Sequence, residues 1–70
     1  MYSKSRMIRE YRLEIEAVET EFMPKGGFPE GYVPIVPNDE EINTLEEYLV
    51  ALKAAIKDVQ NGADPEIYNW

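Results

Sequence analysis

Residues 42–59 read INTLEEYLVALKAAIKDV, and large apolar side chains recur there at steps of three and four residues. The repeating positions are Ile42, Leu45, Leu49, Leu52, Ile56 and Val59. This spacing places them along one side of an α-helix, where they can pack against a second helix. The pattern therefore predicts an amphipathic helix at the centre of the fold.

The same spacing occurs earlier in the chain, at Ile8, Tyr11, Ile15, Val18 and Phe22. Two such segments joined by a connection rich in proline and glycine are typical of an antiparallel two-helix hairpin. We therefore expect an all-α fold in a single small domain. Its expected parts are helix one over about residues 4–22, a connection over 23–38, helix two over about 39–61 and a tail over 62–70.

Capping residues set the predicted helix boundaries. Asn38 followed by Glu41 resembles a capping box at the start of helix two. Thr44 with Glu47 offers a second box, so the start could lie further along the chain. Pro24 is expected to end helix one, because the residue before a proline avoids the helical region.

The connection is long for a link between two helices, and it is unusually apolar. Residues 28–32 read FPEGY, which predicts a tight turn with Pro29 second and Gly31 fourth. The large apolar side chains are Phe28, Tyr32, Val33, Ile35 and Val36. They either cover the open end of the hairpin or are presented to a partner. Covering is the favoured interpretation, because a bare hairpin exposes its core there.

The tail carries three more large side chains, Ile67, Tyr68 and Trp70. Residues 64–66, DPE, can begin a short helical turn. Because an exposed tryptophan leaves a large apolar surface in water, we expect the tail to pack back onto helix two.

Helix two has more apolar surface than helix one can cover. Tyr48, Ala51 and Ala55 lie beside its main apolar row, so roughly half of its circumference is apolar. The connection, the tail or a second copy in a four-helix bundle are candidates to pack there. The predicted apolar interface comprises Phe28, Tyr32, Tyr48, Ala51, Ala55, Tyr68 and Trp70.

The composition excludes several kinds of chemistry. The 70 residues include no cysteine and no histidine. Disulfides, thiolate or imidazole zinc sites, and Ser–His or Cys–His nucleophiles are therefore excluded. Carboxylates alone need a cleft for acid–base catalysis that so small a hairpin does not form. We expect no enzymatic activity, no cofactor and no metal site.

The chain also lacks the apolar segments that a membrane requires. No apolar run approaches the roughly 20 residues of a spanning helix, and none follows the early basic residues as in a secretory leader. With the absence of cysteine, this predicts a soluble protein of the cytoplasm.

Charge is distributed unevenly over the predicted hairpin. The formal net charge is −7, from 14 acidic and 7 basic residues, which argues against direct binding of nucleic acid or anionic membranes. The start of helix one and the end of helix two meet at a basic end, with Lys4, Arg6, Arg9, Arg12, Lys53 and Lys57. Most of the acids gather at the opposite end, beside the connection.

This acidic loop end is the predicted partner-binding surface. Its residues are Glu16, Glu19, Glu21, Asp39, Glu40, Glu41 and Glu47. We expect it to dock on a basic surface of another protein and to inhibit or modulate that protein. The concrete version is a charge mimic that blocks a nucleic-acid-handling protein, as many phage-type inhibitors do.

Two alternatives stay open. The chain could be a self-associating assembly subunit, in which the broad apolar face of helix two joins two copies into a helical bundle. It could also be an adaptor or antitoxin-like peptide that folds only on its partner.

The outer side of helix one carries a further feature, Leu13, which lies off the apolar row beside Arg9 and Arg12. It is either a tolerated exposed leucine or part of a second, smaller contact surface. Arg12 and Glu16 are spaced for an i,i+4 ion pair.

Overall fold

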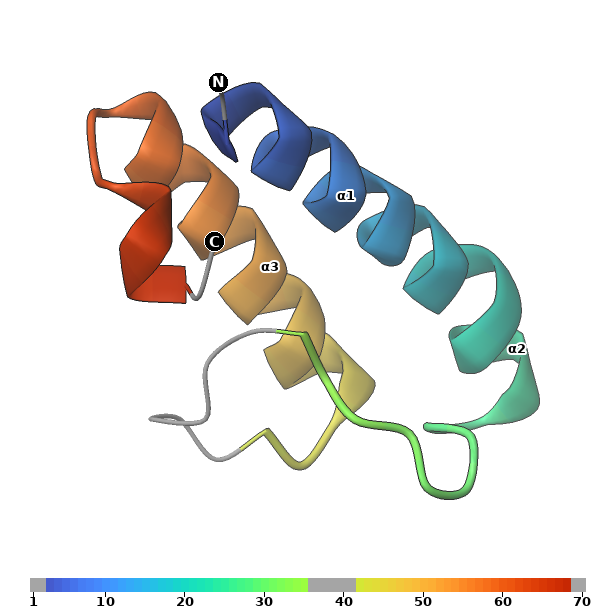
Figure 1. Cartoon of the computed structure of the whole chain (residues 1–70). Helices are drawn as coiled ribbons and strands as arrows, with labels where there is room; N and C mark the ends of the chain where they lie inside the picture. Colours follow the sequence, from blue (N-terminus) through green and yellow to red (C-terminus); the bar gives the residue numbers. More distant parts are fainter. Residues whose placement is uncertain (1–2, 36–41, 69–70) are drawn as a thin grey trace.

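The chain folds into two long helical segments that lie side by side and run in opposite directions (Figure 1). This computed structural model describes residues 3–35 and 42–68. No strand occurs within these two ranges. The expectation of a mainly helical protein is therefore confirmed.

The first helical segment is continuous but changes its hydrogen bonding along its length. α1 spans Ser3–Ala17, η1 is a π-helical turn over Val18–Phe22, and α2 spans Met23–Lys25. In the π turn, the amide of Met23 donates to the carbonyl of Val18, five residues back instead of four. The segment thus extends beyond the predicted end at residue 22.

Pro24 does not end this helix, contrary to the prediction. It lies in the first turn of α2, at the start of a new hydrogen-bonding register, where a missing amide costs little. The end comes at Gly26, whose φ of 89° is left-handed. The Gly26 amide donates to the Met23 carbonyl at 3.1 Å, and the Gly27 amide donates to the Phe22 carbonyl at 3.2 Å. These two bonds form a Schellman motif.

The second long helix, α3, spans Leu45–Gln60 and begins later than predicted. The Thr44 hydroxyl accepts from the Glu47 amide, and the Glu47 carboxylate accepts from the Thr44 amide, both at 3.1 Å. The inner of the two candidate capping boxes is therefore the one that forms. The outer candidate, Asn38 with Glu41, lies outside the described residues.

α3 ends in the same way as α2. Gly62 has a φ of 114°. Its amide donates to the Val59 carbonyl, and the Ala63 amide donates to the Asp58 carbonyl, both at 3.1 Å. A short 3-10 helix, η2, follows over Pro65–Tyr68.

The connection contains a tight turn, one residue later than predicted. The Tyr32 amide donates to the Pro29 carbonyl at 3.0 Å. Gly31 occupies the third position with a φ of 77°. A positive φ at this position is typical of a type II turn, which explains why the glycine sets the register.

The core lies between α1 and α3. The largest wholly buried side chains are Tyr11, Tyr48, Met7, Leu52, Val18 and Val59. The apolar row of the second helix is buried from Leu45 onward, as its spacing predicts, while Ile42 is half-buried. In α1 the deepest position before Tyr11 is Met7, because Ile8 lies toward the edge of the core.

Thr44→Ala should lower the free energy of unfolding by about 1 kcal/mol, because the Glu47 amide loses its side-chain acceptor. Urea denaturation followed by circular dichroism measures this loss. Thr20→Ala is the matched control. The Thr20 hydroxyl only donates to the Glu16 carbonyl of its own helix, at 2.8 Å, and alanine is the better helix former. Equal losses in both variants would contradict the role of Thr44 as the cap.

Candidate functional site

Three of the predicted acidic residues lie on the first helical segment and are exposed: Glu16, Glu19 and Glu21. Within residues 3–35 and 42–68, their carboxylates make no ion pair or hydrogen bond. An exposed carboxylate without a partner keeps its charge available to an approaching molecule. These three residues are the described core of the acidic loop end.

Glu47 has a different role from the one predicted for it. Its carboxylate accepts from the amides of Asn43 at 2.9 Å and Thr44 at 3.1 Å. The Glu47 side chain therefore caps the start of α3. Of the other predicted acidic residues, Asp39, Glu40 and Glu41 lie outside the described residues.

Two exposed acids at the same end were not in the predicted set. Glu30 lies in the tight turn of the connection, and Glu46 lies in the first turn of α3. Their position beside the connection in the sequence is the feature by which they could have been included. Both add negative charge around the predicted surface.

Glu14 precedes these acids on α1, but its carboxylate is bonded inside the fold. It is half-buried, and its carboxylate accepts from the hydroxyls of Tyr48 at 2.6 Å and of Tyr32. The Tyr48 hydroxyl also accepts from the Ile35 amide at 3.0 Å. The Tyr11 hydroxyl donates to the Ile35 carbonyl at 3.4 Å. We call these residues the Glu14–tyrosine cluster; it ties the connection to α1 and α3.

The surroundings of Tyr48 strongly favour its neutral form. Its side chain is wholly buried, and this burial raises the pKa of the hydroxyl above its ordinary value of 10.0. The hydrogen bond to Glu14 and the charge of that carboxylate raise the pKa further, while the Ile35 amide opposes the shift. The hydroxyl therefore remains protonated, and it can donate to Glu14, throughout the neutral pH range.

Aromatic rings surround the Glu14–tyrosine cluster. The rings of Phe22 and Tyr32 meet edge to face with centroids 4.9 Å apart, and Phe28 stacks on Tyr32 at 5.9 Å. Phe28 also contacts Tyr48, at 5.5 Å. Three residues of the predicted apolar interface, Phe28, Tyr32 and Tyr48, thus pack within the chain.

Not every apolar residue of the connection is covered. The side chain of Val33 is 71% exposed and that of Ile35 is 40% exposed. The connection therefore covers the core with its two aromatic rings and leaves two aliphatic side chains outward. Val36 lies outside the described residues.

The broad apolar face of α3 is largely covered by the chain itself. Ala55 is buried, as is Tyr48, and Ala51 is half-buried. The Tyr68 hydroxyl of η2 donates to the Asp58 carboxylate at 2.9 Å. Tyr48 and Ala55 are thus unavailable as a contact surface between two copies, because intramolecular packing already encloses them. Trp70, the last member of that predicted interface, lies outside the described residues.

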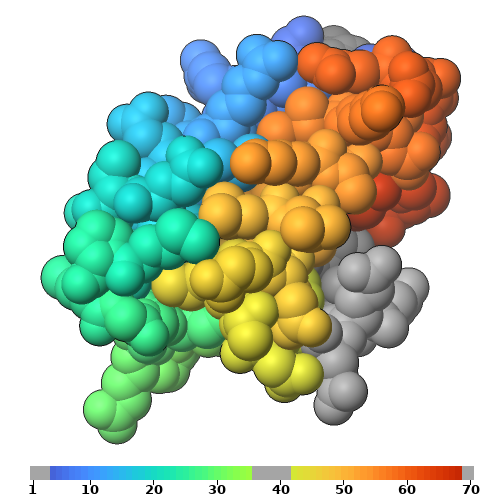
Figure 2. Space-filling model, turned by 180° about the vertical axis from the view of Figure 1, so that it is seen from behind, coloured from blue at the N-terminus to red at the C-terminus, as the bar shows by residue number. Residues whose placement is uncertain are grey.

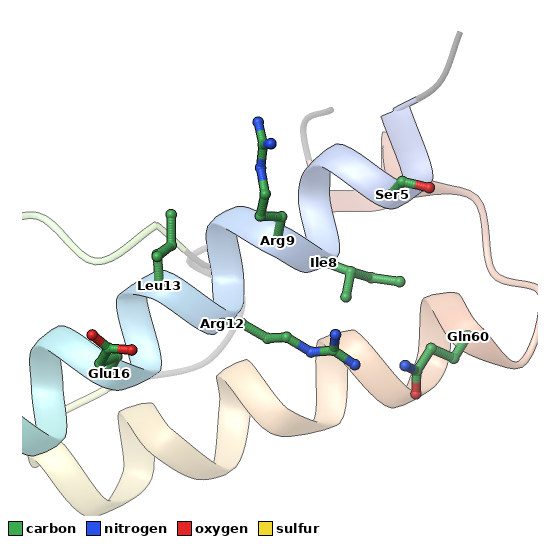
Figure 3. Close-up of a pocket in the computed structure, with 7 residues that line it drawn as sticks. All are labelled: Ser5, Ile8, Arg9, Arg12, Leu13, Glu16 and Gln60. Carbon is green, nitrogen blue, oxygen red and sulfur yellow. The ribbon is translucent and has the colours of Figure 1, made fainter.

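A shallow groove runs along the outer side of α1 (Figure 3). Its apolar part is made by Ile8 and Leu13, and Leu13 is 55% exposed. Arg9, Arg12 and Glu16 line the same groove, and Gln60 of α3 borders it. We call this surface the α1 groove.

The two arginines of the α1 groove are not neutralised. Figure 3 shows the Arg12 side chain extending toward Gln60 and away from Glu16. In the described part of the chain neither Arg9 nor Arg12 has an ion-pair partner. The expected Arg12–Glu16 pair is therefore wrong, and both guanidinium groups are available to another molecule.

A second hollow lies at the acidic loop end, between α2 and the start of α3. Met23, Phe28 and Leu45 provide its apolar lining, and Glu46 lies at its edge. Figure 2 shows the start of α3 in yellow beside the end of the first helical segment in teal and green. The acidic end thus offers an apolar contact as well as charge.

Neither metal binding nor membrane insertion is indicated by the described residues. No group of three or more carboxylates among them is arranged to hold a metal ion. None of the helices described is both long and apolar enough to cross a bilayer.

Tyr48→Phe should lower the free energy of unfolding by about 1–3 kcal/mol, because the Ile35 amide and the Glu14 carboxylate each lose a buried partner. Tyr68→Phe is the matched control, since it removes the exposed hydroxyl bond to Asp58 and leaves the Glu14–tyrosine cluster intact. We expect that control to lose about 0.5 kcal/mol or less. Urea unfolding of both variants checks the difference. A Tyr48→Phe protein as stable as the control would show that the cluster does not hold the fold.

Stability should also fall at alkaline pH through Tyr48. Its pKa is raised above 10.0 in the folded protein, so the unfolded chain releases this proton first. The stabilisation is fully present below about pH 10 and is lost as the pH rises toward the folded pKa. Urea unfolding at a series of pH values from about 8 to 11 measures the decline. Tyr48→Phe should decline less steeply than the unsubstituted chain, and equal slopes would contradict this assignment.

Comparison with known proteins gives no relative from which a function could be transferred. No protein-family model matches the chain, and neither does any curated protein or solved structure. The acidic loop end and the α1 groove are therefore the two candidate binding surfaces.

Proposed function

We propose that this chain is a non-catalytic binding protein whose acidic loop end docks on a basic surface of another protein. The observation that carries this proposal is the set of exposed carboxylates of Glu16, Glu19 and Glu21, which have no ion-pair partner among the described residues. In a chain of net charge −7, these groups form a field that attracts basic surfaces. Such attraction speeds association and weakens as salt is added.

In its concrete form, the proposed partner handles nucleic acid. The carboxylates would occupy positions on that protein that otherwise hold phosphate groups, and the chain would act as an inhibitor or modulator. The charge balance of 14 acidic and 7 basic residues supports this form, as does the accumulation of acids at one end. The absence of cysteine suits the cytoplasm, where we place this interaction.

The apolar hollow beside Glu46 supports the same docking surface. Interfaces generally combine a desolvated apolar centre with a polar rim. Here Met23, Phe28 and Leu45 would form the centre, and the exposed acids would form the rim. A partner side chain that is apolar and flanked by lysine or arginine fits this arrangement.

We further propose that the docking end is held in shape by an antiparallel hairpin whose tail folds back on α3. The hydroxyl bond from Tyr68 to Asp58 supports the position of the tail. The bonds of Glu14 to Tyr32 and Tyr48 support the position of the connection. A connection held in this way offers its surface with little further loss of conformational entropy on binding.

Replacing Glu16, Glu19 and Glu21 together by glutamine should weaken partner capture by about tenfold or more, because the docking surface loses its charge. The measurement uses the immobilised chain in a lysate of the native host, with bound proteins quantified by mass spectrometry. We expect a basic, nucleic-acid-handling protein that duplex DNA displaces from the chain.

The matched control for this experiment is the double variant Ala54→Lys, Glu66→Lys. It changes the net charge by the same three units at exposed positions away from the acidic loop end. The control should capture the partner as well as the unsubstituted chain does. Equal capture by the glutamine variant would refute docking through this surface.

A further inference from the structure

The α1 groove combines two features that a second molecule can contact at the same time. Arg9 and Arg12 are exposed and have no ion pair in the described part of a chain that contains 14 acidic residues. Leu13 lies beside them and is 55% exposed. A surface of this kind fits a segment that presents one carboxylate and one aliphatic side chain close together.

The chain itself carries such a segment, in the turn over residues 29–33. Glu30 is exposed, and Val33 is 71% exposed, the highest fraction among the large exposed hydrophobic residues described. This turn, in green, projects from the lower edge of the molecule in Figure 2. It is an acidic and apolar projection, whereas the α1 groove has two arginines, one glutamate (Glu16) and an apolar part, and so carries a net positive charge.

The projecting turn is also held rigidly. The Tyr32 amide donates to the Pro29 carbonyl at 3.0 Å, which closes the turn. The Tyr32 ring packs on Phe22, and its hydroxyl donates to Glu14. A rigid projection loses little conformational entropy when it enters a groove.

In one molecule this turn does not fill the α1 groove. The turn is held by the contacts of Tyr32 with Glu14 and Phe22, and in that position Glu30 and Val33 remain exposed. Contact between the two features must therefore join different copies of the chain.

We propose that the α1 groove receives the turn over residues 29–33 of a second copy of this chain, with Glu30 beside Arg9 and Arg12 and Val33 against Leu13. This inference does not rest on the proposed function. It also relocates self-association away from the broad face of α3, where Tyr48 and Ala55 are buried.

The size and charge of this contact set the conditions under which it forms. A single turn in a shallow groove covers less area than a stable interface requires, so the association is weak and needs high protein concentration. The net charge of −7 repels two copies at low ionic strength. At about 0.15 M salt the screening length is about 8 Å, so this repulsion is reduced while contacts at short range persist.

Sedimentation equilibrium from about 20 µM to 2 mM, at about 0.15 M salt, tests the proposal. The mean mass of the unsubstituted chain should rise above 8.1 kDa with concentration. Arg12→Glu and Glu30→Arg should each weaken association by about tenfold or more. Arg6→Glu is the matched control, since Arg6 is exposed on the same helix but does not line the α1 groove, and it should associate normally.

A mixture of the two charge variants provides the decisive arm. Arg12→Glu keeps an intact turn and Glu30→Arg keeps an intact groove, so their mixture should associate although neither does so alone. A mass of 8.1 kDa at every concentration of the unsubstituted chain would overturn the proposal. A mixture that stays monomeric, or an Arg6→Glu variant that associates as weakly as Arg12→Glu, would overturn it equally.

Discussion

The buried hydroxyl of Tyr48 is the constraint on which the rest of the structure depends. It lies on α3, donates to Glu14 of α1 at 2.6 Å and accepts from the Ile35 amide of the connection at 3.0 Å. Three segments of the chain therefore meet at one oxygen atom. A buried polar group without partners costs about 1–3 kcal/mol, which is a large part of the stability of so small a domain. The Ile35 amide and the Phe28 and Tyr32 rings thus bind the connection to the same buried side chain.

These contacts explain how the apolar surplus of the second helix is used. The rings of Phe28 and Tyr32 cover Tyr48, and η2 contacts Asp58 through the Tyr68 hydroxyl. Tyr48 and Ala55 of the broad apolar face of α3 are therefore buried inside one molecule. Exposed charge on the described chain lies at the acidic loop end and in the α1 groove, and each of these surfaces has apolar side chains beside it.

These two surfaces share a physical property. In the part of the chain described, neither Glu16, Glu19 and Glu21 nor the arginines of the α1 groove form ion pairs. Exposed ion pairs contribute little to stability, so folding does not require these charges to be neutralised within the chain. They are free to act over distance on other molecules. Docking on a basic protein and contact with a second copy are both proposed from these unpaired charges.

The sequence by itself determined which two segments are helical, because the spacing of apolar residues acts within a few residues. It left the start of α3 open between two capping boxes, and it misplaced the end of the first helical segment at Pro24. It also located exposed acids such as Glu16 and Glu19, since these need only a solvated helix face. Only the tertiary structure decided that Glu14 bonds inside the fold. The hydroxyls that donate to its carboxylate belong to Tyr32 and Tyr48, which lie 18 and 34 positions away in the sequence. It likewise decided that Arg12 stays unpaired, because side-chain direction depends on what α3 places beside it. Local spacing specifies which segments are helical, whereas contacts across the fold specify which side chains remain available.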